Sequence, residues 1–220
     1  MASTRLPNKV AALISGKPLL QHVIERVKAA KLVDEVVVAS GSSPKNQPVF
    51  DIAFKCGVSA YPGDENDVLD RFYRCAKCFE ATHIVRITAD DPFKDPAMID
   101  RVVNTLLVTG ADYASNTIEP TFPLGIDVEA FTFDALTRAH KAATETYQRE
   151  HVTPYIYNKP TLFKLASVRL SDLRWTCDTA EDLEWIQSVY SHLYKEGEVF
   201  SMADVLNLLD RHPELVRLNK

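Results

Sequence analysis

The sequence predicts an α/β fold in which a mostly parallel sheet is flanked by helices. Segments whose apolar residues recur every three to four positions alternate with short apolar runs. The run at 35–40 does not alternate with polar residues, which is typical of a strand covered on both faces, and the run at 83–88 is interpreted in the same way. Such a β-α-β succession implies a parallel sheet with right-handed crossovers.

The elements of the first half follow one another closely. An apolar stripe predicts the first helix, at 17–31, and consists of Leu20, Val23, Ile24, Val27 and Ala30. The other elements expected here are strands at 35–40, 58–61 and 83–88 and helices at 48–56, 66–80 and 96–108.

The pattern changes after Ala111. A loop at 117–125, rich in Pro and polar residues, separates two strands and is expected to shape a substrate pocket. Thr179 is the expected N-cap of a late helix whose first turn is acidic. The elements expected in this half are strands at 112–116, 126–131 and 162–168, the last outside the parallel set, and helices at 133–142, 147–157, 180–193 and 202–209.

Composition indicates a soluble enzyme. With 220 residues and 46% hydrophobic content, residues 1–220 can form one domain, which we expect to carry a small inserted lobe for substrate or dimer contacts. The net charge of -5 argues against nucleic-acid binding. No apolar run is long enough to span a membrane and no signal-peptide core is present, so we expect a cytoplasmic protein.

The cysteines are interpreted as structural thiols. Cys75 and Cys78 have the spacing of a redox or zinc pair, but they lie inside a helical pattern and no second pair completes a site. Cys177 precedes Asp178 on an extended segment and is expected to face the core. No disulfide is expected in a reducing compartment.

Two carboxylates stand where secondary structure changes. Asp90 follows the run at 83–88, and Asp178 comes just before the helix at 180–193. Ligands collect at such strand ends in α/β sheets, and the two carboxylates together are expected to hold one divalent cation. Singly, each also has a structural interpretation, as a strand-to-turn exit and as a helix-capping neighbour.

Basic residues near the N-terminus indicate an anionic ligand. Arg5 and Lys9 flank Pro7 on a stiffened loop, and Lys17 stands at a helix start. On their own such residues are most often solvated surface charges. Combined with two metal-binding carboxylates, they favour a nucleoside triphosphate site.

Several segments together resemble a known family, the cytidylyltransferases of sugar activation. The resemblance is greatest to the spore-coat polysaccharide type, related to the synthetases of CMP-3-deoxy-octulosonate and CMP-sialic acid. It implies a Rossmann-like nucleotide-diphospho-sugar transferase fold. The segments that carry it, in the order of the family, are 3–9, 16–19, 67–71, 85–90, 125–129, 149–155 and 178–183.

The N-terminus departs from this family. Its members usually begin with a strand and a Gln-Ala-Arg-like turn ahead of the segment at 3–9, whereas Met1 here lies two residues before Ser3. We therefore expect the first strand, a central one, and one phosphate-binding Arg to be missing, either because the start was assigned at an internal Met, which we favour, or because the element was lost. An opened sheet costs several kcal/mol. Asn8 also replaces a common Gly.

The resemblance and the residue types assign roles to individual positions. Mg²⁺ is expected on Asp90 and Asp178. The nucleotide is expected to contact Ser3, Arg5, Lys9, Lys17, Ser40 and Asp90, with Arg5, Lys9, Asp90 and Asp178 as the catalytic set. The sugar is expected to contact Arg71, Asp127, Glu129, Arg149 and His151, although His151 is equally interpretable as a structural residue at a helix start.

The function predicted is Mg²⁺-dependent transfer of CMP from CTP to a sugar or sugar acid, with release of pyrophosphate, for surface polysaccharide synthesis. One alternative is a metal-dependent nucleotide-sugar glycosyltransferase, which lacks the support of a clear Asp-x-Asp motif. Another is a non-catalytic binding domain, favoured by the missing strand. A homodimer formed through 117–128 is also expected.

Overall fold

The computed structural model describes residues 8–119, 121–168, 175–212, 214 and 215. Most predicted helices are present within a few residues of their expected ends. Side-chain caps at Asp67, Asp95, Thr132, Thr179 and Ser201 begin five of them. The helices are α1 Leu19–Lys28, α2 Gln47–Lys55, α3 Val68–Cys78, α4 Pro96–Thr109, α5 Phe133–Ala142, α6 Thr146–His151, α7 Pro154–Tyr157, α8 Ala180–Leu193 and α9 Met202–Arg211, with single 3₁₀ turns η1 Lys9–Ala11 and η2 Pro44–Asn46.

One predicted helix, 147–157, is divided into α6 and α7. Val152, the residue after α6, has a φ of 72°, which an α-helix does not allow. Pro154 then begins α7, and the residue before a proline is disfavoured from continuing a helix. The apolar periodicity continues across the break, so pattern alone could not reveal it.

The strands form a four-stranded mixed sheet and separate two-stranded sheets. In the order β5-β7-β6-β8, β7 is antiparallel to both neighbours, and β8 is parallel to β6. The expectation that the 162–168 strand lies outside the parallel set was therefore wrong. The strands are β1 Leu13–Ile14, β2 Lys17–Pro18, β3 Val37–Gly41, β4 Ser59–Gly63, β5 His83–Arg86, β6 Tyr113–Ser115, β7 Glu129–Thr132 and β8 Leu165–Ser167. The hairpin of β1 and β2 was not predicted.

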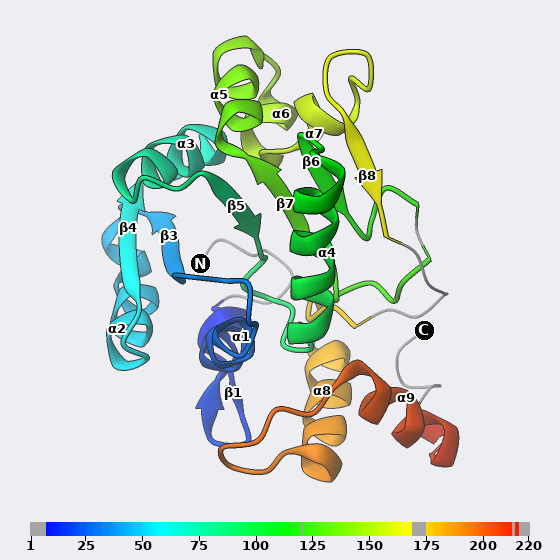
Figure 1. The fold of residues 1–220 in the computed structure, drawn as a ribbon. Helices are drawn as coiled ribbons and strands as arrows, with labels where there is room; N and C mark the ends of the chain where they lie inside the picture. Colours follow the sequence, from blue (N-terminus) through cyan, green and yellow to red (C-terminus); the bar gives the residue numbers. More distant parts are fainter. Residues whose placement is uncertain (1–7, 120, 169–174, 213, 216–220) are drawn as a thin grey trace.

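The sheet is interrupted between β3 and β5. Within the described residues, β3 pairs only with β4, in parallel, and β5 pairs only with β7. Figure 1 shows β3, β4 and α2 on one side of this interruption and the four-stranded sheet with α4 on the other. The residues of β5, and all of β3 except Gly41, are half-buried or exposed, although the sequence predicted buried strands. This difference follows from the interruption, because each strand has one edge that pairs with no other described strand.

An aromatic core fixes the segment after β5 against the C-terminal helices. The ring of Phe93 lies 5.6 Å from that of Trp175 and 5.3 Å from that of Trp185, all three being buried. Cys177 is also buried, as its position predicted. This packing brings the strand-end segment at 88–93 beside the segment that leads into α8 (Figure 1).

Candidate active site

Three residues far apart in the sequence meet at one point. The ammonium group of Lys9 lies 2.5 Å from Oδ2 of Asp90 and 3.1 Å from Oδ1 of Asp178. Lys9 begins η1, Asp90 follows β5, and Asp178 precedes α8. The structure thus brings together the three described members of the predicted catalytic set, which we call the Lys9 cluster.

The Lys9 cluster is partly desolvated. The three side chains are 15%, 28% and 21% exposed, in the order Lys9, Asp90 and Asp178. Burial alone would lower the pKa of Lys9, but its hydrogen bonds to Asp90 and Asp178 and their charges outweigh burial and raise it. Within the cluster, one ammonium group therefore faces two carboxylates.

The turn before Lys9 adopts an unusual backbone. Asn8 has φ 59° and ψ 22°, in the left-handed region. Asn tolerates this region better than other non-glycine residues. The Asn at this position thus permits the turn into η1 that a Gly in the family would also permit. Ser3 and Arg5 lie outside the described residues.

Asp178 is held by the start of α8. The carboxylate of Asp182 accepts the backbone N–H of Asp178 at 2.8 Å and that of Thr179 at 2.9 Å, and Thr179 Oγ1 accepts the N–H of Asp182 at 3.2 Å. This reciprocal capping box confirms Thr179 as the N-cap. The N–H of Cys177 also donates to the carbonyl of Asp90 at 3.3 Å, which links the two acidic segments directly.

A buried lysine anchors the segment that carries Asp90. The Nζ of Lys94, a side chain with 0% exposure, donates to Asp91 at 2.8 Å and to the carbonyl of Asp127 at 2.6 Å. Thr88 also donates to Asp91. Burial raises the pKa of the Asp91 carboxyl, while Lys94 and Thr88 act in the opposite direction. A buried charge of this kind persists only when it is paired.

Sequence reasoning missed Lys94. The signal was present, because a lysine three residues after an aspartate in a short strand-end loop is a possible ion pair. Arg26 of α1 supports the same segment from another side, since its Nε donates to the Lys94 carbonyl at 2.5 Å. The charged side chains of Lys94 and Arg26 therefore hold the segment at 88–95 in place, and the sequence pattern did not predict this role.

Close backbone packing joins a second loop to the site. Gly125 has φ +100°, and a Cβ there would lie 2.3 Å from the backbone carbon of Trp175. Only glycine fits this contact without displacement. The loop before Asp127 thus lies against the segment that leads to Asp178.

Lys17 does not belong to the Lys9 cluster. Its ammonium group bonds Glu25 at 3.1 Å and Glu196 at 2.9 Å. Burial would lower the pKa of Lys17, but bonds to Glu196, Tyr194 and Glu25 raise it. Glu196 follows the C-terminal end of α8, whereas Asp178 precedes its N-terminal end, about 20 Å away for a helix of this length. The structure thus does not bring Lys17 to the Lys9 cluster, and its contribution to the phosphate field stays a prediction.

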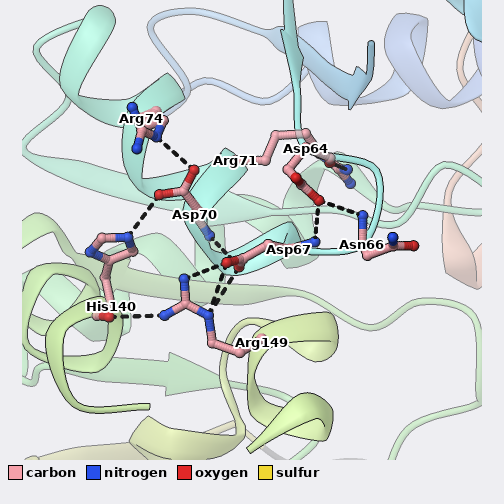
Figure 2. A network of polar contacts seen from close by, with 8 residues as sticks. All are labelled: Asp64, Asn66, Asp67, Asp70, Arg71, Arg74, His140 and Arg149. Atoms are coloured by element: carbon pink, nitrogen blue, oxygen red, sulfur yellow. Dashed lines mark hydrogen bonds and ion pairs between the residues drawn. The ribbon is translucent and has the colours of Figure 1, made fainter. Parts of the chain in front are cut away.

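Arg149 is engaged in a separate network that joins α3 to α6. Its Nε and terminal nitrogen donate to Asp67 at 3.1 and 2.6 Å, and its other nitrogen donates to the carbonyl of His140 at 2.9 Å. Asp70 accepts from Arg74 at 2.6 Å and bonds His140 at 2.9 Å (Figure 2). In this structure the guanidinium of Arg149 is committed to protein partners, which argues against the predicted sugar contact.

Arg71 borders the same network but is less completely bonded. Its terminal nitrogen donates to the carbonyl of Asp64 at 2.6 Å (Figure 2). Its buried Nε reaches no hydrogen-bond partner among the described residues. Burial lowers the pKa of Arg71, and the charges of Glu65 and Asp64 raise it in part.

Glu129 is buried among donors. It accepts from Arg86, from the Tyr113 hydroxyl at 2.7 Å and from Thr153 Oγ1 at 2.5 Å. A carboxylate with three donors holds strands and the start of α7 together, and the sugar contact of Glu129 stays a prediction.

The remaining predicted contacts are spread over the surface. Asp127 is half-buried, and burial and the charge of Glu129 raise its pKa while Lys94 and Arg86 lower it. His151 is exposed, with its ring 4.6 Å from that of Tyr147. Ser40 lies near the carboxyl end of β3 and is half-buried. Of these, Asp127 is joined to the segment that carries Asp90, because Lys94 bonds both the Asp127 carbonyl and the Asp91 carboxylate.

Comparisons with known proteins identify a nucleotidyltransferase. A family model described as cytidylyltransferase matches residues 1–203. A relative from Methanocaldococcus jannaschii, called an uncharacterized protein, is 36% identical over 99% of this chain and 90% of its own length. The spore coat polysaccharide biosynthesis protein SpsF of Bacillus subtilis is 31% identical over 97% of this chain and 92% of its own.

Solved structures agree. A cytidylyltransferase from Leptospira borgpetersenii superimposes with a TM-score of 0.94 at 30% identity, covering 100% of this chain and 94% of that one. A CMP-2-keto-3-deoxy-manno-octonic acid synthetase complexed with CTP shares the fold, with a TM-score of 0.66 at 16% identity over 87% of this chain and 95% of its own. The chain belongs to the cytidylyltransferase family. In the part of it that the structure describes, no helix is both long and apolar enough to span a bilayer.

Proposed function

We propose that this nucleotidyltransferase is Mg²⁺-dependent and transfers CMP from CTP to a sugar or sugar acid, releasing pyrophosphate. The observation that carries the proposal is the Lys9 cluster, in which a cation and two carboxylates from distant segments meet in a chain of the cytidylyltransferase family.

The chemistry required is an in-line displacement at phosphorus. An acceptor oxygen attacks the α-phosphate, the bond from that phosphorus to the β-phosphate oxygen breaks, and the hydroxyl proton leaves to solvent or a base. Negative charge increases on the nonbridging and leaving oxygens. Lys9 can offset that charge because its ammonium group is cationic throughout the physiological range, its pKa being raised.

Asp90 and Asp178 fit a magnesium ion. They already hold a positive charge, the Lys9 ammonium, between them. Among the described residues no group of three or more acidic, His or Cys side chains forms a metal cage. Mg²⁺ does not usually require such a cage, because one or two carboxylates bind it together with substrate phosphates. When bound there, the ion would neutralise phosphate charge.

The acceptor class is supported by the relatives. SpsF is named for spore coat polysaccharide biosynthesis, and a 3-deoxy-manno-octulosonate cytidylyltransferase of Geobacter sulfurreducens is 41% identical over 48% of this chain and 41% of its own length. We therefore propose a sugar or sugar acid destined for a surface polysaccharide. Among the acceptor contacts we propose Asp127 first, because Lys94 bonds both its carbonyl and the carboxylate of Asp91, the neighbour of Asp90.

The test is pyrophosphate release by the purified protein. CTP, UTP, GTP and ATP are compared with Mg²⁺ or a chelator and a panel of sugar acids and sugar phosphates. Release with CTP and one acceptor, lost on chelation, is the expected result. Release that persists with a chelator would contradict the metal assignment, and silence from a folded protein would favour a binding domain.

A homodimer formed through 117–128 belongs to the same proposal. Leu124, in this segment, is 50% exposed. Light scattering at micromolar concentration should give twice the chain mass, and a monomer mass would remove the proposal.

A further inference from the structure

Lys94 is the most deeply buried charged residue among those that the structure describes, with no exposed surface. Its ammonium group is paired with Asp91, whose side chain is also buried. A buried ion pair of this kind stabilises a fold only weakly, because the cost of removing two charges from water offsets their attraction. Packing alone therefore gives no reason for a charge here, since an apolar side chain of the same length would fill the space.

The ammonium group of Lys94 joins two segments that are distant in the sequence. It donates to Oδ2 of Asp91 at 2.8 Å and to the carbonyl oxygen of Asp127 at 2.6 Å. Asp91 follows Asp90 directly, and Thr88 donates to the same carboxylate oxygen as Lys94. One buried side chain thus ties the loop of Asp127 to the segment of Asp90.

The loop at 125–128, which we call the acceptor loop, is otherwise held by a buried amide. Asn116 is 1% exposed, donates to the carbonyl of Ile126 at 3.0 Å and accepts the backbone N–H of Val128 at 2.8 Å. Lys94 bonds the residue between these two. The backbone of the acceptor loop is therefore fixed at three successive residues, and the bond from Lys94 connects it to the strand-end segment after β5.

Transfer between two bound substrates depends strongly on such a connection. The acceptor oxygen must lie about 3–3.5 Å from the α-phosphorus, in line with the leaving pyrophosphate, and a displacement of about 1 Å can lower the rate about a hundredfold. In the proposed function, Asp90 holds the nucleotide through Mg²⁺ and Asp127 contacts the acceptor. Lys94 then sets the position of one substrate relative to the other.

We propose that Lys94 is a positioning residue for the transfer step, which holds the acceptor loop in place relative to Asp90. The inference rests on the proposed function and adds to it a residue that acts through Asp91 and Asp127. A purely structural lysine would affect folding alone, whereas a positioning residue also sets kcat and the KM for the acceptor.

The kinetic test removes both charges of the pair together. In the double variant Asp91→Asn/Lys94→Met neither charge is left buried without its partner, so the Tm should stay within a few degrees of the wild type. We expect kcat to fall at least tenfold and the KM for the acceptor to rise at least tenfold, while the KM for CTP stays within threefold. Wild-type values of kcat and of the acceptor KM in the folded variant would overturn the proposal.

The matched control is Arg26→Met, which removes another buried cation from the same segment. Arg26 donates to the carbonyls of Lys94 and Phe200, at 2.5 and 2.7 Å, and among the described residues it has no hydrogen bond to Asp127. This variant should lower the Tm and leave both KM values within threefold. An equal rise of the acceptor KM in the control and the double variant would show a general loosening of the segment and overturn the assignment to Lys94.

Hydrogen exchange tests the connection without turnover. The N–H of Val128, which donates to Asn116, reports on the acceptor loop. Its exchange should become at least tenfold faster in Asp91→Asn/Lys94→Met and change less than threefold in Arg26→Met. Unchanged exchange in the double variant would overturn the proposal whether or not the wild type is active. Absence of pyrophosphate release by the wild type, with faster exchange in the double variant, would contradict the proposed function and leave the connection through Lys94 supported.

Discussion

The Lys9 cluster and the network around Arg149 contain the same kinds of groups, but they lie at different places in the fold. In the first, one ammonium group faces two carboxylates, which follow β5 and precede α8. In the second, the Arg149 guanidinium forms a two-nitrogen contact with one carboxylate, and backbone carbonyls take its remaining nitrogen (Figure 2). Ligands collect at strand ends in α/β sheets, whereas the Arg149 network joins one helix to another. The comparison leads us to expect different roles for the two sets of predicted site residues.

The largest effect is expected from Asp90→Asn in the Lys9 cluster. Asparagine keeps the size of the side chain but removes the charge that holds a cation, so pyrophosphate release should fall at least a hundredfold. The Tm should change by only a few degrees. Activity within threefold of the wild type would show that Asp90 does not carry the metal.

Lys9→Met should lower activity and make the Tm of the protein depend more strongly on Mg²⁺. Without the ammonium group the two carboxylates repel each other, so Mg²⁺ should raise the Tm of this variant more than that of the wild type. Pyrophosphate release should fall about tenfold to a hundredfold, because the ammonium group that offsets phosphate charge is lost. The matched control is Lys17→Met, which removes the same group from the pair with Glu25 and Glu196 and should change neither quantity. Equal behaviour of the two variants would remove Lys9 from the site.

Arg149→Met should have the opposite effect to Asp90→Asn. It should lower stability more than activity. Loss of the contact to Asp67 and of the carbonyl bonds should reduce the free energy of unfolding by about 1–2 kcal/mol. Urea denaturation measures it. At 20 °C turnover should stay within about threefold of the wild type.

A double-mutant cycle sharpens that test. Asp67→Asn and Arg149→Met remove two ends of one contact, so their effects on unfolding should not add. Additive free energies would show that the contact does not stabilise the fold. A large loss of turnover in Arg149→Met at unchanged stability would instead restore its predicted sugar-binding role.

The smallest expected effect concerns how steeply folding stability is lost at acid pH. Burial would raise the pKa of Asp70, but bonds from Arg74 and His140 lower it below 3.8 in the folded protein. A depressed pKa contributes stability that is present above the unfolded value and is lost as the pH falls through the folded one. Asp70→Asn should therefore make the loss of stability below pH 4 less steep, as thermal unfolding from pH 6 to pH 3 would show. An unchanged slope would contradict the shift.

The sequence predicted the elements of this protein better than their pairing. The bounds of α5 and α8 agree with the expected helices because amphipathic periodicity and capping are local properties. The antiparallel position of β7 and the parallel pairing of β8 depend on contacts distant in the chain, which no local pattern encodes. The split of α6 from α7 depends on one backbone angle at Val152.

Predictability of the site follows the same division. Asp90, Asp178 and Lys9 were predicted because carboxylates at strand ends and a basic loop are signals of ligand binding, and the structure brings the three side chains together. The sequence did not reveal the protein partners of Lys17 and Arg149. These partners, Glu196 and Asp67, lie in distant parts of the chain whose packing no local pattern encodes. Lys94 escaped notice because its role depends on complete burial.

The most direct test compares one substitution in each polar cluster. Asp178→Asn and Asp67→Asn make the same chemical change, and pyrophosphate release from CTP is measured for both at a temperature where both are folded. We expect a loss of at least a hundredfold in the first and a change within threefold in the second. Equal activities in the two variants would contradict the assignment of the Lys9 cluster as the catalytic site.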